Sequence, residues 1–144
     1  MRYMVLVKMT GQAAEDYENG RMPTQEEISA MMSYNQELAA AGIMQGGEGL
    51  HPSAKSIKVS HGEGKPVVTD GPFAEAKELI GGYWLWNVTS REEAIAWAEK
   101  CPLSPGDILE LRQVFEMEDF GDAIGPEEMA KIKDVEQKIA ASQP

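Results

Sequence analysis

The chain has 144 residues, of which 42% are hydrophobic and 26% are charged, a composition typical of folded globular proteins. Its net charge of −11 argues against nucleic acid and anionic membranes as partners, because both are bound mainly through Lys and Arg, and no apolar stretch approaches the length of a membrane span. The lone cysteine, Cys101, allows no disulfide within the chain, which favours a cytoplasmic location.

The first third of the chain predicts a strand, a loop and a helix. Residues 3–7 are apolar on both alternating faces, as in an interior strand, and the polar, glycine-containing residues 11–23 predict a loop. Thr24 and Glu27 have the spacing of a capping box, so a helix is expected to start there and to end at Gly42. The apolar face of this helix consists of Ile28, Met31, Met32, Leu38 and Ala39.

The middle of the chain predicts four more strands, two of which form a hairpin. A strand starts at Ile43 and continues into glycine-rich residues 46–49. Residues 56–60 and 66–69 flank a turn at 62–64, which predicts a β-hairpin. Residues 82–88 form the strongest predicted strand, with one face made of Trp84, Trp86 and Val88 and the other of Tyr83 and Leu85.

The last third predicts a helix, a strand and an appended helix. Residues 89–93 cap a helix with Cys101 on its apolar face, where the cysteine acts as a small hydrophobe. Alternation over 108–117 predicts a strand that turns Leu109, Leu111, Phe115 and Met117 to the core and Glu110, Arg112 and Glu116 away. We therefore expect a domain at 1–117, followed at 118–144 by a linker and an amphipathic helix that starts at Pro126.

The order β-α-β, hairpin, β-α-β predicts an α+β fold of the ferredoxin-like, split-βαβ type with an inserted hairpin. Two helices then cover one face of an antiparallel sheet. The strands at 3–7 and 82–88 are apolar on both faces, so the other face would expose a large apolar patch, which monomers rarely tolerate. We expect a second copy of the chain to cover it, giving a homodimer of the dimeric α/β-barrel type.

Three motifs occur in a recognisable order. They are Gly46-Gly47-Glu48-Gly49-Leu50-His51-Pro52-Ser53, then Asp70-Gly71-Pro72-Phe73-Ala74-Glu75-Ala76-Lys77-Glu78, then Gly81-Gly82-Tyr83. With the later 90–94, 101–103 and 108–112 segments, they resemble the DGPF-domain proteins, a branch of the YCII-related superfamily, over residues 1 to about 116. The resemblance implies a dimeric ferredoxin-like barrel. It also implies a proposed catalytic histidine–aspartate pair with its histidine near the first helix, whereas the two histidines here are His51 and His61.

The Asp70–Phe73 turn allows two interpretations. In the structural one, Asp70 forms an Asx-turn, Pro72 fixes its backbone and Phe73 anchors the corner. In the functional one, Asp70 is a general acid or base whose pKa is raised by desolvation, and His51 is its partner.

Four further side chains are candidates for ligand binding. Arg112 is a fixed cation suited to a carboxylate if its strand face looks into the space between two sheets, and an ordinary edge residue if it looks outward. Tyr83, Glu48 and Phe73 complete the candidate set. The cysteine and histidine count predicts no zinc site, and the sequence contains no dinucleotide or phosphate-loop motif, so we expect no cofactor.

Three functions are compatible with these patterns. The first is an enzyme-like or ligand-binding homodimer with a pocket between the sheet and the hairpin loop, which takes a small acidic or aromatic molecule. The second is a non-catalytic interaction or regulatory module in which the Asp70–Phe73 turn is only a structural corner. The third, by analogy of fold alone, is a cofactor-independent oxygenase.

Overall fold

The computed structural model describes residues 1–73 and 78–144, so residues 74–77 of the second motif lie outside the described residues. The chain divides into two compact units, Met1–Val114 and Phe115–Pro144. The first unit contains β1 (Arg2–Met9), α1 (Gly11–Glu18), α2 (Gln25–Ala40), β2 (Met44–Gly49), η1 (Ser53–Lys55), β3 (Ile57–Ser60), β4 (Val67–Asp70), β5 (Leu79–Asn87), α3 (Arg91–Glu99) and β6 (Asp107–Gln113). The second contains η2 (Met117–Ala123) and α4 (Pro126–Ser142).

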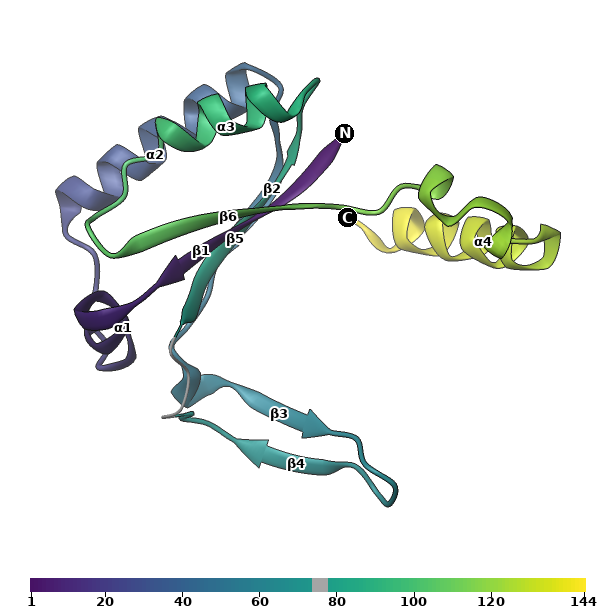
Figure 1. Cartoon of the computed structure of the whole chain (residues 1–144), viewed down its shortest axis with the longest axis horizontal. Helices are drawn as coiled ribbons and strands as arrows, with labels where there is room; N and C mark the ends of the chain where they lie inside the picture. The colour runs from purple at the N-terminus through teal and green to yellow at the C-terminus, as the bar shows by residue number, and fades with distance from the viewer. Residues whose placement is uncertain (74–77) are drawn as a thin grey trace. The chain divides into compact units, whose positions relative to one another are not determined.

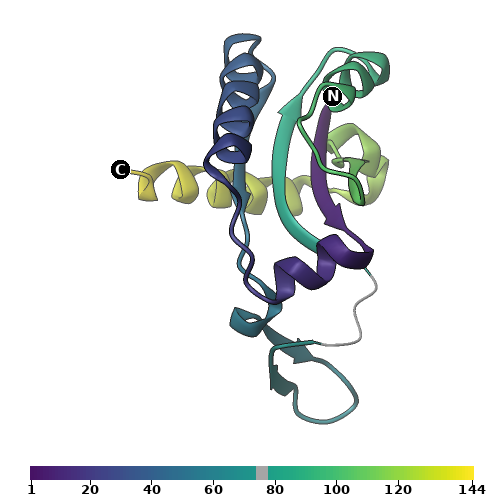
Figure 2. The same ribbon diagram turned by 90° about the vertical axis from the view of Figure 1, so that its left-hand side faces the viewer.

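The first unit is a mixed α+β structure built on an antiparallel sheet of four strands in the order β2-β5-β1-β6. β5 and β1 run side by side in the middle of this sheet (Figure 2). Its edge strands, β2 and β6, do not pair with each other, so the sheet is open rather than a closed barrel. β3 and β4 form the separate, predicted hairpin, which lies beyond the ends of β2 and β5 and away from α2 and α3 (Figure 1).

The core lies between α2, α3 and one face of the four-stranded sheet. Trp86 and Val5 are fully buried there, because the alternation of β1 and β5 sends every second side chain toward the helices, and Leu38 of α2 is fully buried from the helix side. Two core aromatics have partners for their polar atoms: the Tyr34 hydroxyl donates to the Trp97 carbonyl, and the Trp84 indole N–H donates to the Asn35 side chain. The buried Trp86 indole N–H has no hydrogen-bond partner among the described residues. This face, which we call the covered face, contains the predicted Trp84, Trp86 and Val88.

The helix starts are partly as predicted. Thr24 and Glu27 form the expected capping box at the start of α2, and Ser90 accepts a hydrogen bond from the Glu93 amide at the start of α3. The predicted apolar face of α2 is wrong in part. Leu38 is buried beside Tyr34, but Ile28 and Met32 are exposed.

Three other predicted elements need correction. Residues 11–18 form helix α1 rather than a loop. Thr10 stands at its N-cap position, but the Thr10 hydroxyl donates to the Gly106 carbonyl and does not cap the helix. The last strand ends at Gln113, and Phe115 and Met117 are exposed instead of facing the core. The predicted linker at 118–122 lies within the short 3₁₀ segment η2.

The second unit consists of η2 and the predicted amphipathic helix, α4. Pro126 occupies the first turn of α4, where its missing N–H costs no helical hydrogen bond. Within this unit the rings of Phe115 and Phe120 lie 5.2 Å apart, and Val135 and Ile139 of α4 are exposed. No helix among the described residues combines the length and apolar character needed to cross a membrane.

Candidate functional site

The Asp70–Phe73 turn is bonded to the loop that contains η1. The Gly71 amide donates to the Ser56 carbonyl at 2.8 Å, and the Phe73 amide donates to the Ser53 hydroxyl at 3.0 Å. The peptide bond between Gly71 and Pro72 is cis. A Cβ atom at Gly71 would lie 1.7 Å from the Ser53 carbonyl oxygen, so only glycine fits at this close approach.

The same loop is bonded to helix α1. The Glu18 carboxylate accepts from the Ser53 amide at 2.9 Å and, through its other oxygen, from the Ser53 hydroxyl. The Tyr17 hydroxyl donates to the Leu50 carbonyl. Ser53 therefore bridges α1 and the Asp70–Phe73 turn, and its hydroxyl both donates and accepts. We call this arrangement of Glu18, Ser53, Gly71 and Phe73 the corner.

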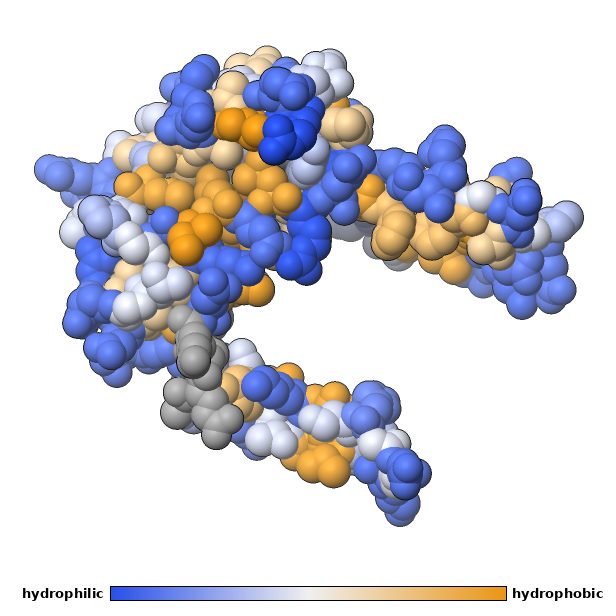
Figure 3. All heavy atoms as spheres, in the orientation of Figure 1, coloured by the Kyte–Doolittle hydropathy of each residue, from blue (hydrophilic) through white to orange (hydrophobic). Residues whose placement is uncertain are grey.

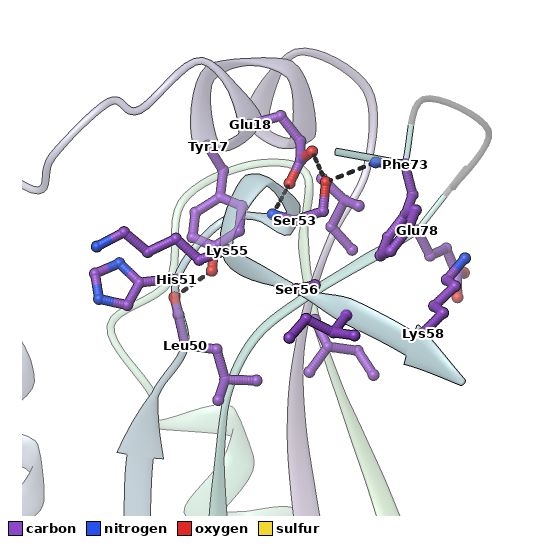
Figure 4. Close-up of a pocket in the computed structure, with 13 residues that line it drawn as sticks. Tyr17, Glu18, Leu50, His51, Ser53, Lys55, Ser56, Lys58, Phe73 and Glu78 are labelled. Atoms are coloured by element: carbon purple, nitrogen blue, oxygen red, sulfur yellow. Dashed lines mark hydrogen bonds between the residues drawn. The ribbon is translucent and has the colours of Figure 1, made fainter. Parts of the chain in front are cut away.

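A pocket of about 650 Å³ opens beside the corner (Figure 4). Its walls come from α1, the η1 loop, the start of β3, the corner and the start of β5. The lining residues are Tyr17, Glu18, Leu50, His51, Ser53, Lys55, Ser56, Ile57, Lys58, Phe73, Glu78, Leu79 and Ile80. The pocket thus combines apolar and aromatic surface with a few charged groups, as small-molecule sites do.

The two glutamates of this pocket have hydrogen-bond or ion-pair partners, whereas its two lysines have no acidic partner among the described residues. The Glu18 carboxylate accepts a hydrogen bond from the Ser53 amide, and Glu78 forms an ion pair with Lys8 at 3.3 Å. Within residues 1–73 and 78–144, neither Lys55 nor Lys58 has an acidic partner, and the Lys58 ammonium lies 3.9 Å from the centre of the Phe73 ring. His51 and Lys55 project to one side of the pocket and Lys58 to the other (Figure 4).

Burial around the pocket affects Tyr17 most clearly. Loss of contact with water raises the pKa of its phenol, and the neighbouring Glu18 carboxylate raises it further. Tyr17 therefore stays protonated at neutral pH and keeps its hydrogen bond to the Leu50 carbonyl. It is a donor that shapes the pocket rather than a base.

The second face of the four-stranded sheet, which we call the open face, carries a row of ion pairs that reaches the pocket. Lys8 donates to Glu110 at 2.8 Å and to Glu78, and Arg112 also pairs with Glu110. The hydrogen bond from Lys8 is the main reason that the pKa of Glu110 is lowered and the pKa of Lys8 is raised. Because Glu78 lines the pocket, the row connects Arg112 to the pocket rim.

The six predicted site residues fall into three places. His51 and Phe73 line the pocket. Tyr83, Glu48 and Arg112 lie on the open face, since Tyr83 is opposite both Glu48 and Leu6, and Arg112 is opposite Met4. Asp70 ends β4 in the hairpin.

Asp70 is exposed in the single chain and is not among the pocket-lining residues. The acid/base hypothesis needs desolvation of this carboxylate, and this chain alone does not provide it. His51 and Asp70 are therefore not brought into one pocket. The hydrogen bonds of Gly71 and Phe73 instead support the structural interpretation of the turn.

Sequence reasoning missed most of the pocket. Tyr17 and Glu18 were hidden in the predicted loop, although Ala14, Tyr17 and Glu18 have the i, i+3, i+4 spacing of a helix face. In the sequence, Ser53 stands out only as part of a motif, and Lys55 and Lys58 carry no signal beyond their charge. The two lysines are notable because they line a pocket in a chain that has almost twice as many acidic as basic residues.

Neither a metal-binding cluster nor a reactive thiol is found among the described residues. Among the described residues, no group of three or more His, Cys, Asp or Glu side chains could hold a metal ion. Cys101 is half-buried against the core, and burial raises the pKa of its thiol to about 12, so it is a weak nucleophile at neutral pH.

Comparison with known proteins gives one family. The model of the YCII-related domain matches residues 1–118. An uncharacterized protein of Rhizobium meliloti (strain 1021) is 39% identical over 49 residues, which cover 34% of this chain and 40% of the relative. The match therefore spans about two fifths of the length of that curated relative.

Proposed function

This chain belongs to the YCII-related domain family, and we propose that it binds a small organic anion in the pocket beside the corner. The observation that carries the proposal is the position of Lys55 and Lys58 around an apolar, aromatic cavity of a strongly acidic protein. A ligand with an aromatic or aliphatic body and a carboxylate matches these walls. The apolar body would contact Leu50, Ile80 and Phe73, and the carboxylate would meet a lysine.

We further propose that the protein is a cytoplasmic homodimer whose two sheets pack face to face. The strand order β2-β5-β1-β6 supports a ferredoxin-like arrangement, and the lone cysteine supports the location. The open face supports the dimer. Met4, Ile80 and Ile108 are exposed there, around half-buried Leu6, Tyr83 and Leu85, and such a patch is typical of an interface.

A titration with two matched probes tests the ligand proposal. Benzoate carries the proposed charge, and benzamide has the same ring without it. We expect benzoate, and not benzamide, to shift the NMR signals of the Leu50 and Phe73 amides at millimolar concentration. Equal shifts with both probes, or none with either, would overturn the proposal.

A matched pair of lysine variants tests whether a positive charge in the pocket contributes to benzoate binding. Lys58→Gln removes a charge from the pocket, and Lys65→Gln removes one from the hairpin turn outside it. Because an exposed ion pair contributes little, we expect Lys58→Gln to weaken benzoate binding about two- to fivefold. Lys65→Gln should leave it unchanged.

A second candidate function is a non-catalytic interaction module, favoured by the exposure of Asp70 and by the structural role of the corner. In that case no ligand needs to occupy the pocket, and the open face is the functional surface. The two candidates differ in the benzoate titration, because an interaction module would bind neither probe.

A further inference from the structure

The pocket beside the corner contains as many acidic as basic side chains. Lys55 and Lys58 line it together with Glu18 and Glu78, and the charges of these four residues cancel. The preference for an organic anion therefore depends on which neighbouring groups engage or offset the two carboxylates.

The two glutamates differ in this respect. Glu18 accepts hydrogen bonds from the Ser53 amide through one oxygen and from the Ser53 hydroxyl through the other, so both of its oxygens are engaged. Glu78 has a side chain that is 53% exposed, and it forms an ion pair with Lys8 at 3.3 Å. In Figure 4, Glu78 lies on the same side of the pocket as Lys58. Glu78 is therefore the carboxylate that would repel a bound anion if Lys8 did not offset its charge.

Lys8 lies outside the pocket but next to one of its walls. It stands on β1 opposite Ile80 of β5, and Ile80 lines the pocket. The Lys8 side chain is only 16% exposed, and its ammonium donates to Glu78 and, at 2.8 Å, to Glu110. These hydrogen bonds, the one to Glu110 most of all, raise the pKa of Lys8, so it remains a cation at neutral pH.

The charge balance of the pocket depends on this one cation. The row of ion pairs from Glu78 to Arg112 contains two acidic and two basic side chains, so it is neutral as a whole. The charged lining residues that remain are the two lysines and Glu18, which together carry one positive charge. Without Lys8 the row would carry one negative charge, and the positive charge of the pocket would be cancelled.

The apolar walls of the pocket strengthen the effect of each charge. Leu50, Ile80 and Phe73 line it, and on the side of the molecule drawn in Figure 3 the first unit carries apolar side chains next to hydrophilic ones. Charges beside apolar surface are less screened than charges in bulk water, so they interact more strongly. The loss of one charge at the rim is therefore expected to change the affinity for a charged ligand measurably.

We infer that Lys8, which does not itself line the pocket, is the positioning residue that makes the pocket prefer anions. It acts by pairing with Glu78, because the ion pair holds this carboxylate at β1 and offsets its charge. The inference rests on the proposed function and deepens it, since it assigns the charge selectivity of the same pocket to a residue outside it. Without the Lys8 charge, the preference shifts from anions toward cations.

Two probes of opposite charge and similar shape test this inference. Benzoate is an anion and benzamidine is a cation at neutral pH, and each has a single phenyl ring. Lys8→Met removes the charge and keeps a long, unbranched side chain, and circular dichroism checks that the variant is folded. In titrations followed by the NMR signals of the Leu50 and Phe73 amides, Lys8→Met should weaken benzoate binding about two- to fivefold and strengthen benzamidine binding by a similar factor. Weaker binding of both probes would indicate a structural defect and would overturn the inference.

Second-site variants trace the effect to Glu78. In the Lys8→Met background, Glu78→Gln should restore most of the benzoate affinity. Glu110→Gln should restore less, because Glu110 does not line the pocket and still has its ion pair with Arg112. Lys8→Arg, which keeps the charge, should bind benzoate within about twofold of the wild type. Equal recovery by Glu78→Gln and Glu110→Gln would contradict the inference.

The same titrations separate this inference from the proposed function. If the wild type binds benzoate and Lys8→Met binds both probes as the wild type does, the proposed function stands and the role of Lys8 is wrong. A wild-type chain that does not bind benzoate would overturn both.

Discussion

The two faces of the four-stranded sheet differ in whether other elements of the same chain cover them. On the covered face, α2 and α3 pack over Trp86 and Val5, which have no exposed surface. On the open face, the same strands present Met4, Leu6 and Leu85, which are exposed or half-buried, and a row of ion pairs from Glu78 to Arg112.

This difference shows what the alternation of β1 and β5 encodes. A strand that needed only one covered face would place polar residues at every second position, yet β1 has Met4 and Leu6 where such residues would stand. β1 and β5 therefore have apolar side chains on both faces of the sheet, but the helices of the same chain cover only one of these faces. The proposed second copy accounts for the remainder.

The largest expected effect contrasts one side chain from each face. Leu38→Ala should lower the free energy of unfolding by about 2–5 kcal/mol at any protein concentration, because Leu38 is fully buried within one chain. Met4→Ala should cost little in dilute solution and more at concentrations where the dimer forms. Urea unfolding at two protein concentrations measures both, and a concentration-independent loss for Met4→Ala would contradict the contrast.

A smaller effect is expected at the corner. Gly71→Ala would force a Cβ atom against the Ser53 carbonyl, so it should cost about 1–3 kcal/mol and shift the pocket residues. Gly62→Ala is the matched control, since a Cβ atom at Gly62 meets no atom within 4 Å. Urea unfolding of both variants checks the stability, and equal losses would show that the corner does not require glycine.

The ion pairs of the open face predict a dependence on pH. The pKa of Glu110 is held below its ordinary value of 4.5, chiefly by Lys8, so its contribution to stability is present above that value and is lost as the pH falls through the lowered pKa. Glu110→Gln should therefore remove part of the acid sensitivity of unfolding between about pH 5 and pH 3. Glu26→Gln, on an exposed position of α2, serves as the control. Identical pH profiles for wild type and Glu110→Gln would contradict the prediction.

The smallest effect concerns reactivity rather than stability. Burial raises the pKa of Cys101 to about 12, so very little thiolate is present at pH 8 and iodoacetamide should react slowly with the folded chain. In urea the reaction should approach the rate of a free cysteine. Mass spectrometry follows the alkylation, and fast modification of the folded chain would show that the thiol is not buried on the covered face.

The sequence predicted the architecture better than the pocket, for physical reasons. Strand alternation and the caps at Thr24 and Ser90 are local signals, and they located most of the elements of the sheet unit. Helix α1, which bears Tyr17 and Glu18, is only eight residues long and begins at a glycine, so the sequence gives a weak signal for it.

The site could not be read from the motif for a related reason. The Asp70–Phe73 turn is distinctive in sequence because Gly71 must fit against Ser53, which is a packing requirement rather than a chemical one. The pocket beside it is assembled by long-range contacts, such as Glu18 with Ser53 and Ser53 with Phe73, and spacing along the chain does not reveal them.

Oxidation of methionines by dilute hydrogen peroxide tests most directly whether a second copy covers the open face. Met4 lies on that face and is 38% exposed in the single chain, while Met22, in the segment before α2, is 77% exposed and serves as an internal reference. Mass spectrometry across a range of protein concentrations should show Met4 becoming protected as the concentration rises, with Met22 oxidised at a constant rate. A Met4 rate that stays constant relative to Met22 at every concentration would contradict the account.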